Sequence, residues 1–300
     1  TNKMNHSQHA PLMENLRQAY RERFGETLTL GAIEPLGGGS ISRAMRLSTS
    51  RGPLLLKWKH NGPPDLFERE AESLLELRKN PNPYLHIPEP LLWKSIGTEP
   101  GFLLTDYLEP GHTPREDENL GRGLAVLHQV YNDCFGFFSA NYCGETRQDN
   151  TFQTDWIPFY REKRIGHLIR QIEQYRDWNT ADGKLLERFL ANATQWIGHR
   201  PKPSLIHGDL WSGNFLYTRN GPALIDPCVS YSDREFEMGI MTMFGGFAPP
   251  VYEAYCETNP FPDGWKERNL IYQLYHVLNH YLLFGGHYKM QALGILKRFV

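Results

Sequence analysis

The chain has 300 residues, a formal net charge of −2, and hydrophobic and charged fractions of 40% and 22%. This balance is that of a folded globular chain, and it argues against a polybasic surface for nucleic acid or membranes. The first ten residues lack the apolar segment of a secretory signal, no apolar run could span a bilayer, and the four cysteines follow no zinc or disulfide pattern. We therefore expect a cytoplasmic protein with reduced cysteines and with no nucleic-acid or membrane partner.

The first third of the chain alternates short apolar runs with glycine-rich turns, a texture typical of antiparallel strands. In chain order, the spacing of apolar residues predicts a helix over 12–24 that ends at Gly25, strands within 27–59, a charged helix over 66–78, and strands over 91–96 and 102–107. A proline-rich segment over 80–90 can form neither a helix nor an inner strand.

Beyond the segment 108–111, which we interpret as a hinge because it contains Pro-Gly, the chain becomes mostly helical. Helices are predicted over 120–128, 156–175, 184–197 and 265–284. The sequence therefore indicates an α+β fold of two parts: a small, antiparallel β-rich domain over 1–107 and a larger, mainly helical domain over 108–300.

The most informative motif lies in the loop over 205–216, where His207, Asp209 and Asn214 follow the spacing H-x-D-x-x-x-x-N. Phosphotransferases use this spacing because a carboxylate must orient the attacking hydroxyl and accept its proton, while an amide oxygen helps to hold magnesium. Asp226 ends a short apolar strand further on and is interpreted as a second magnesium ligand. An ordinary polar loop and a plain turn residue before proline are the alternatives.

A glycine-rich turn between two predicted strands consists of Gly37, Gly38, Gly39 and Ser40. Its backbone N–H groups could approach phosphates, although three glycines are more often just a flexible turn. Lys57 lies in an apolar strand, where its ammonium could reach the phosphates, and Glu70 on the next helix could pair with it. Lys59 is an alternative for the lysine, and Glu68 and Glu72 are alternatives for the glutamate.

The order of these elements is that of a kinase: glycine loop, strand lysine, helix glutamate, hinge, catalytic loop, and strand aspartate. A Rossmann fold and a Walker-type ATPase are excluded because their glycine motifs are absent. Trp211 stands where a protein kinase has lysine, Pro227 follows the aspartate in place of Phe-Gly, and no Ala-Pro-Glu motif follows. We therefore expect a small-molecule substrate rather than a peptide docked on an activation segment.

Along nearly its whole length the sequence resembles the fructosamine/ketosamine-3-kinase family, a relative of aminoglycoside and choline kinases within the protein-kinase-like fold. The motifs that carry the resemblance are the glycines 37–39, His-Gly-Asp-Leu-Trp-Ser-Gly-Asn over 207–214, Ile-Asp-Pro over 225–227, Asp-Arg-Glu over 233–235 and Phe-Gly-Gly-Phe over 244–247. Trp211 and the Phe-Gly-Gly-Phe run separate this family from generic aminoglycoside kinases. The resemblance implies phosphorylation, with ATP, of the 3-hydroxyl of a sugar attached to an amine by glycation. The phosphorylated ketosamine then eliminates phosphate and releases the amine, which is deglycation.

The resemblance also implies roles for individual residues. Asp209 becomes the catalytic base, Asn214 and Asp226 bind Mg²⁺, Lys57 holds the ATP phosphates paired with Glu70, and Asp106, Tyr107 and Leu108 present backbone groups to adenine. This chain departs from its relatives at two places. Ser40 replaces a cysteine that can form a redox-sensitive disulfide between subunits, so no such switch is expected, and Glu-Met-Gly over 237–239 replaces Asp-Leu-Ala.

The predicted substrate residues are Trp211, Asp233, Glu235 and His280, with Trp156 and Phe247 as further candidates. Polar and aromatic walls suit a sugar, although each aromatic residue could instead belong to the core. The expected substrate is a ketosamine, free or attached to a protein, and the expected oligomeric state is a monomer or weak dimer. A kinase of an aminoglycoside, choline or similar amine is the alternative within the same fold, and a scaffolding pseudokinase is the alternative outside catalysis.

Overall fold

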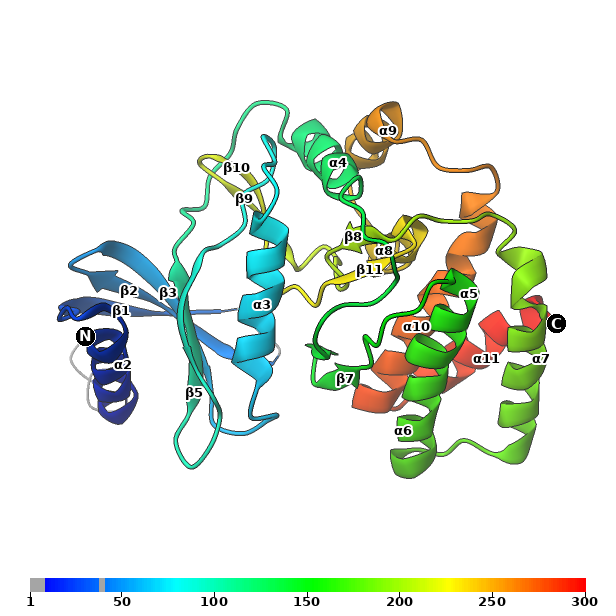
Figure 1. The fold of residues 1–300 in the computed structure, drawn as a ribbon, viewed down its shortest axis with the longest axis horizontal. Helices are drawn as coiled ribbons and strands as arrows, with labels where there is room; N and C mark the ends of the chain where they lie inside the picture. The colour runs from blue at the N-terminus through cyan, green and yellow to red at the C-terminus, as the bar shows by residue number, and fades with distance from the viewer. Residues whose placement is uncertain (1–8, 38–40) are drawn as a thin grey trace. The chain divides into compact units, whose positions relative to one another are not determined.

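The computed structural model describes residues 9–37 and 41–300. The chain divides into two compact units (Figure 1). Unit 1 comprises Thr1–Lys79 and Ile87–Pro110, and unit 2 comprises Asn80–His86 and Gly111–Val300. Within the described ranges, no helix is both long enough and apolar enough to cross a membrane.

Unit 1 is built on an antiparallel sheet of five strands in the order β1-β2-β3-β5-β4. Its elements are α2 (Ala10–Phe24), β1 (Leu30–Leu36), β2 (Arg43–Thr49), β3 (Gly52–Lys59), α3 (Leu66–Arg78), β4 (Pro90–Lys94) and β5 (Gly101–Asp106). Helix α2 ends where the sequence predicts, because Gly25 adopts a left-handed conformation with φ of 70°. Strand β4 lies at an edge of the sheet, where Pro90 removes no inner hydrogen bond.

The two faces of β3 have different neighbours. Leu54, Leu56 and Trp58 are buried and pack in one apolar cluster with residues of α2. The side chains between them, including Lys57, point to the opposite face, which α3 covers (Figure 1). This alternation brings Lys57 towards α3, the helix that carries Glu70.

Unit 2 is mainly helical. Its helices are α4 (Glu116–Leu127), α5 (Trp156–Pro158), η1 (Phe159–Gly166), α6 (His167–Tyr175), α7 (Thr180–Trp196), α8 (Arg234–Met241), α9 (Pro249–Thr258), α10 (Trp265–Phe284) and α11 (Tyr288–Arg298). Helix α10 packs against α6, α8 and α11 and contributes Ile271, Tyr275 and Leu278 to the main core. The helix predicted over 156–175 has the right extent, but its middle is a π-helix, η1.

Three short two-stranded antiparallel sheets lie in unit 2. They are β6 (Asn141–Cys143) with β7 (Thr146–Gln148), β8 (Ser204–Ile206) with β11 (Ser230–Ser232), and β9 (Phe215–Thr218) with β10 (Gly221–Leu224). The loop over 207–214 joins β8 to β9, and the loop over 225–229 joins β10 to β11. Two backbone hydrogen bonds hold these loops together: Ile225 N donates to Asn214 O at 3.0 Å, and Cys228 N donates to His207 O at 2.9 Å.

Candidate active site

The catalytic-type loop over 207–214 is fixed from within by His207. The Nε2 of this buried imidazole lies 2.6 Å from the carbonyl oxygen of Ile225, and its Nδ1 accepts the backbone N–H of Asp209 at 3.2 Å. One nitrogen must therefore donate while the other accepts, which requires the neutral ring. Burial lowers the pKa of His207, which favours this neutral form.

A buried carboxylate that the sequence analysis did not assign to the site holds the same loop from outside. Glu237, on α8, accepts the backbone N–H of His207 at 2.6 Å and that of Gly208 at 3.0 Å. Although burial opposes ionisation, its contacts with His128 and His207 lower the pKa of Glu237. The carboxylate is thus charged at neutral pH and fixes the loop immediately before Asp209.

Gly208 can occupy its position only because it has no side chain. Its φ is +93°, and a Cβ atom there would lie 2.0 Å from the carbonyl oxygen of Cys228. Both the left-handed backbone and the close approach therefore favour glycine. The neighbouring loop carries a second unusual backbone, since Asp226 has φ of 55°, a region that aspartate tolerates better than most residues.

Asp209 is partly buried, and its carboxylate lies among other negative groups. Burial and the nearby charges of Asp226 and Glu237 raise the pKa of Asp209 well above its ordinary value. A raised pKa makes the carboxylate a stronger proton acceptor. Asn214 donates its amide to the backbone oxygen of Asp209 at 2.8 Å and, more weakly, to the carboxylate at 3.4 Å.

Asn214 and Asp226 have the donor atoms that a magnesium site needs. The amide nitrogen of Asn214 is used on Asp209, and within the described residues no hydrogen bond is made to its amide oxygen. The backbone bond between Ile225 and Asn214 keeps the two segments adjacent. An amide oxygen and a carboxylate are hard ligands, so these residues fit Mg²⁺.

In unit 1 the structure joins Lys57 to Glu70. The Lys57 Nζ lies 2.5 Å from Glu70 Oε1, and the two side chains are only 14% and 15% exposed. The alternative glutamates Glu68 and Glu72 both pair with Arg69. Of the three glutamates that the sequence spacing allowed, Glu70 is thus the one that the structure pairs with Lys57. Of the glycine-rich turn, Gly37 follows β1, while Gly38, Gly39 and Ser40 lie outside the described residues.

The segment Asp106, Tyr107 and Leu108 leads out of β5. The N–H of Asp106 bonds to the Glu89 carbonyl and that of Tyr107 to the Pro53 carbonyl, both at 3.3 Å. No such bond to the N–H of Leu108 is present among the residues that the structure covers. Of the three predicted adenine-binding positions, Leu108 thus keeps a backbone donor for a ligand.

Trp211 and His280 belong to one row of aromatic side chains in unit 2. Trp211 is 36% exposed, and its indole lies so close to Gly213 that a Cβ atom there would be 2.1 Å from the ring. Its ring meets Phe244 edge-on at 6.2 Å, and the Phe244 ring lies 5.0 Å from that of His280. A partly exposed row of rings beside the catalytic-type loop suits the C–H faces of a sugar.

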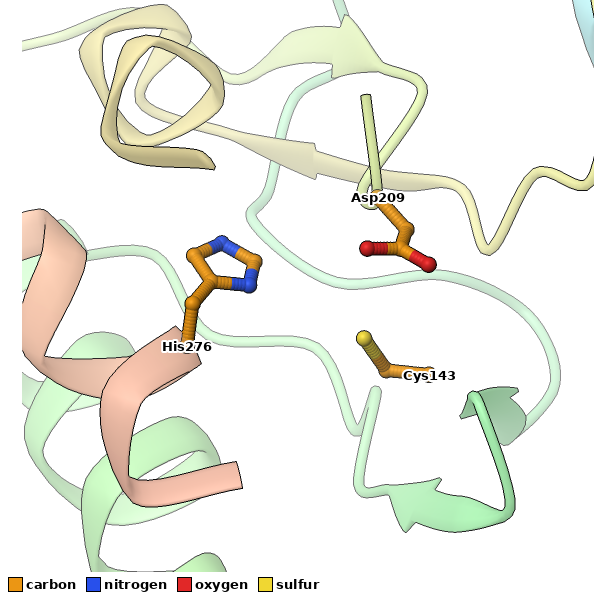
Figure 2. A group of neighbouring side chains, drawn as sticks. All are labelled: Cys143, Asp209 and His276. Atoms are coloured by element: carbon orange, nitrogen blue, oxygen red, sulfur yellow. The ribbon is translucent and has the colours of Figure 1, made fainter. Parts of the chain in front are cut away.

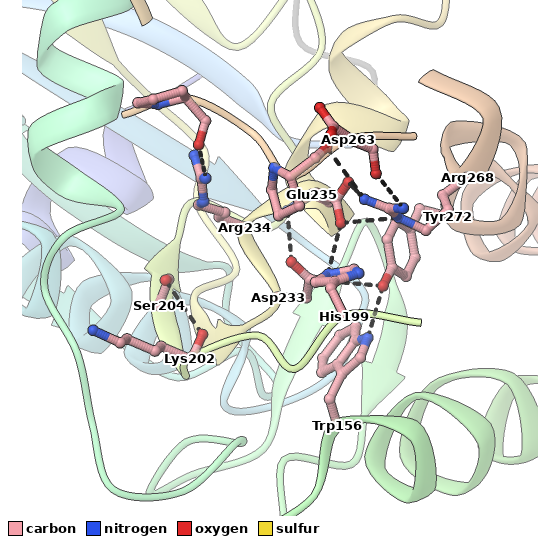
Figure 3. Close-up of polar contacts among 12 residues, drawn as sticks. Trp156, His199, Lys202, Ser204, Asp233, Arg234, Glu235, Asp263, Arg268 and Tyr272 are labelled. Carbon is pink, nitrogen blue, oxygen red and sulfur yellow. Dashed lines mark hydrogen bonds and ion pairs between the residues drawn. The ribbon is translucent and has the colours of Figure 1, made fainter. Parts of the chain in front are cut away.

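Asp233 and Glu235 are instead surrounded by protein groups (Figure 3). Asp233, only 1% exposed, accepts from the Tyr272 hydroxyl and pairs with His199 Nε2, both at 2.7 Å. Glu235 pairs with the same His199 atom at 2.7 Å and with Arg268 at 2.8 Å. These bonds favour a structural role for both carboxylates over contact with a substrate.

The remaining two candidates also pack inside unit 2. Trp156 is buried and donates its indole N–H to the Tyr272 hydroxyl at 2.9 Å. Phe247 is partly buried, and its ring lies 5.0 Å from that of Phe215. The geometry therefore favours a core role for Trp156.

Sequence reasoning missed the groups that reach the loop from distant segments. Besides Glu237 and His128, these are Cys143 at the end of β6 and His276 in α10, whose ligand atoms lie near the Asp209 carboxylate. No residue spacing assigns a role to Cys143 or His276, and only the tertiary fold brings them together. The hydrophobic spacing of α10 could have shown that His276 lies on its buried face.

Comparison with known proteins gives consistent results. A protein-family model described as fructosamine kinase matches residues 12–300. A probable ketoamine kinase of Enterococcus faecium is 34% identical over 273 residues, which are 90% of this chain and 95% of that protein. The chloroplastic protein-ribulosamine 3-kinase of Arabidopsis thaliana is 33% identical over 280 residues, which are 91% of this chain and 83% of that protein.

A solved structure from Thermobifida fusca, provisionally named a fructosamine-3-kinase, has a TM-score of 0.80 at 27% identity. The match covers 94% of this chain and 97% of that chain. This likeness confirms the expected α+β fold of the protein-kinase type. Because the family model spans nearly the whole chain and relatives exceed 30% identity, the chain belongs to the fructosamine kinase family.

Proposed function

We propose that the protein is an ATP-dependent kinase that phosphorylates the 3-hydroxyl of ketosamines, the sugar adducts that glycation forms on amines. The observation that carries the proposal is the presence, in a chain of this family, of Asp209 and Asn214 on an H-x-D-x-x-x-x-N loop whose backbone N–H groups are held by Glu237. The names of the relatives support the substrate class and the position of the hydroxyl.

Asp209 acts as the general base in this proposal. Its carboxylate orients the sugar hydroxyl and accepts the proton as the oxygen attacks the terminal phosphoryl group of the nucleotide. ATP supplies that phosphoryl group, and magnesium neutralises the charge that builds up on it. Asn214 and Asp226 would hold the metal through their amide and carboxylate oxygens. Glu237 keeps the loop, and with it Asp209, in one position.

The proposed nucleotide contacts in unit 1 are those of the glycine-rich turn, Lys57 and the segment after β5. The Lys57 ammonium binds phosphate oxygens, and Glu70 keeps that ammonium oriented. The N–H of Leu108, to which no described residue offers a backbone acceptor, is a donor for the adenine ring. The glycines before Ser40 offer backbone N–H groups to the phosphates.

Trp211 and His280 are the proposed substrate contacts in unit 2. Their rings offer an apolar surface to the sugar, whether the ketosamine is free or attached to a protein. The product carries its phosphate on C3, so loss of a C1 proton next to the C2 ketone lets the phosphate leave, and hydrolysis by water of the imine that results releases the amine. The phosphorylation therefore leads to deglycation.

The experiment that tests the proposal compares Asp209→Asn with Asp226→Ala in a ketosamine phosphorylation assay. Asp209→Asn should lower turnover by roughly 10²–10⁴-fold and leave the affinity for Mg-ATP largely intact, because only the base is lost. Asp226→Ala should weaken Mg-ATP binding itself. Near-full turnover of Asp209→Asn, or unchanged Mg-ATP affinity of Asp226→Ala, would contradict the roles assigned here.

A further inference from the structure

Three potential metal ligands from distant segments converge at the catalytic-type loop of unit 2. Cys143 lies at the end of β6, His276 lies in α10, and Asp209 lies between β8 and β9 (Figure 2). Their ligand atoms all lie within 4.8 Å of one another. Figure 2 shows the thiol, the imidazole and the carboxylate pointing into one common space. Cys143 and His276 are buried, whereas Asp209 is partly exposed and connects the group to solvent.

His276 differs from the other two members in the surroundings of its ring nitrogens. Its side chain is 1% exposed, yet no hydrogen bond reaches either ring nitrogen from the residues that the structure describes. Its ring is held by stacking on Phe236 at 5.5 Å and by an edge contact with Tyr275 at 5.1 Å. Burial lowers the pKa of His276 to about 3, so the ring is neutral and keeps a lone pair. A ring nitrogen in this position is available to bind a ligand.

Cys143 is a free thiol beside a second free thiol. The second thiol belongs to Cys228, and neither cysteine forms a disulfide. The site therefore combines sulfur, imidazole nitrogen and carboxylate oxygen. Zn²⁺ binds such mixed sets tetrahedrally, while Mg²⁺ requires oxygen ligands.

A second cluster of potential metal ligands in unit 2 differs from the first in how its charges are balanced. His199, Asp233 and Glu235 also lie close enough to hold a metal (Figure 3). Their charges, however, are already matched, because His199 bonds to both carboxylates and Arg268 pairs with Glu235. A cation there would have to displace Arg268, whereas among the described residues no ion pair is made to Cys143, His276 or Asp209, and the buried Arg164 acts on Cys143 and His276 through its charge without pairing with them.

We propose that Cys143, His276 and Asp209 form an inhibitory site for a thiophilic divalent cation, and that Zn²⁺ is the ion that fits best. Ligand atoms around tetrahedral zinc lie roughly 3.5 Å apart, so small side-chain rotations close the group around an ion and leave a fourth position open. On binding, the Cys143 S–H bond breaks, its proton goes to solvent, and a sulfur–metal bond forms. The inhibition rests on the proposed function, because the metal occupies the carboxylate oxygen of Asp209 that would accept the substrate proton.

Cobalt titration of the full chain tests the metal site without any substrate. Co²⁺ added to the metal-free protein should give thiolate-to-cobalt absorption in the near ultraviolet, at one ion per chain. Cys143→Ser should abolish this absorption, and His276→Gln should weaken binding at least roughly tenfold. Cys256→Ser, on α9 and outside the cluster, should behave as the native protein. Absence of the band in the native protein, or its persistence in Cys143→Ser, would overturn the site.

Inhibition is then measured in buffered free zinc with excess Mg-ATP, as the ratio of each variant's activity with and without zinc. At a zinc concentration that leaves the ratio for Cys143→Ser near one, the activity of the native protein and of Cys256→Ser should fall at least roughly tenfold. A chelator should restore the activity of both proteins. Cobalt binding without zinc inhibition would overturn the inhibitory role and leave the proposed function standing. No ketosamine phosphorylation by the metal-free protein would overturn the proposed function and leave the metal site standing.

Discussion

The substitution Glu237→Gln tests how the catalytic-type loop is held. The carboxylate accepts two backbone N–H groups, from His207 at 2.6 Å and Gly208 at 3.0 Å, and the side chain is buried. Glutamine keeps one accepting oxygen and turns an NH₂ group towards the other N–H. A hydrogen bond to a charged group contributes about 1.5–3 kcal/mol, and a buried donor without an acceptor costs about 1–3 kcal/mol.

We therefore expect Glu237→Gln to lower the free energy of unfolding by about 2–4 kcal/mol. For a chain of this size, that is a fall of roughly 3–6 °C in Tm. Because the loop carries Asp209, kcat should fall by about 10²-fold while the KM for ATP changes little.

The assay combines thermal unfolding followed by circular dichroism with steady-state kinetics well below Tm. Glu253→Gln is the matched control, because Glu253 is exposed on α9 and its substitution should change the free energy of unfolding by less than about 0.5 kcal/mol. If Glu237→Gln behaves like this control in both Tm and kcat, the carboxylate does not hold the loop and the reasoning is refuted.

Three further predictions concern His199, Gly208 and Trp211. Although burial opposes its charge, hydrogen bonds to two buried carboxylates raise the pKa of His199 from 6.5 to about 9. The stabilisation from this pairing is thus complete below about pH 6.5 and is lost as the pH rises through 9. Tm should therefore fall over this pH range, and His199→Gln should make Tm nearly independent of pH there. Equal slopes of Tm against pH in the two proteins would contradict the ion pair. Gly208→Ala should abolish activity, because the new Cβ atom clashes with the Cys228 carbonyl, whereas Gly294→Ala, with open space around it, should remain active. An active Gly208→Ala variant would show that the loop tolerates a side chain at this position. Trp211→Ala should raise the ketosamine KM by up to roughly tenfold, and an unchanged KM would remove the indole from the substrate site.

Most of the fold follows from local patterns in the sequence. The alternation of apolar residues in β3 and the helical spacing before Gly25 predict elements that the structure contains. The π-helix η1 escaped prediction, and the buried Arg164 on it donates hydrogen bonds to the Asp149 backbone and the Asn150 side chain. Tertiary partners of this kind leave no periodic signal.

The candidate site divides in the same way. Asp209 and Asn214 could be named because they share one loop whose spacing reflects the chemistry. Lys57 could be named from its strand, but its partner could not be chosen between neighbouring glutamates until the face of α3 was seen. Glu237 and His276 reach the loop from α8 and α10, and their roles depend on packing over long sequence separations.

Product analysis tests the central claim most directly. The native protein is incubated with Mg-ATP and, separately, ribulosamine and fructosamine adducts of lysine, kanamycin and choline, and mass spectrometry and phosphorus NMR locate any transferred phosphate. We predict phosphate on O3 of a ketosamine, followed by release of phosphate and free lysine. Transfer to kanamycin or choline alone, or to none of these compounds while ATP still binds, would contradict it.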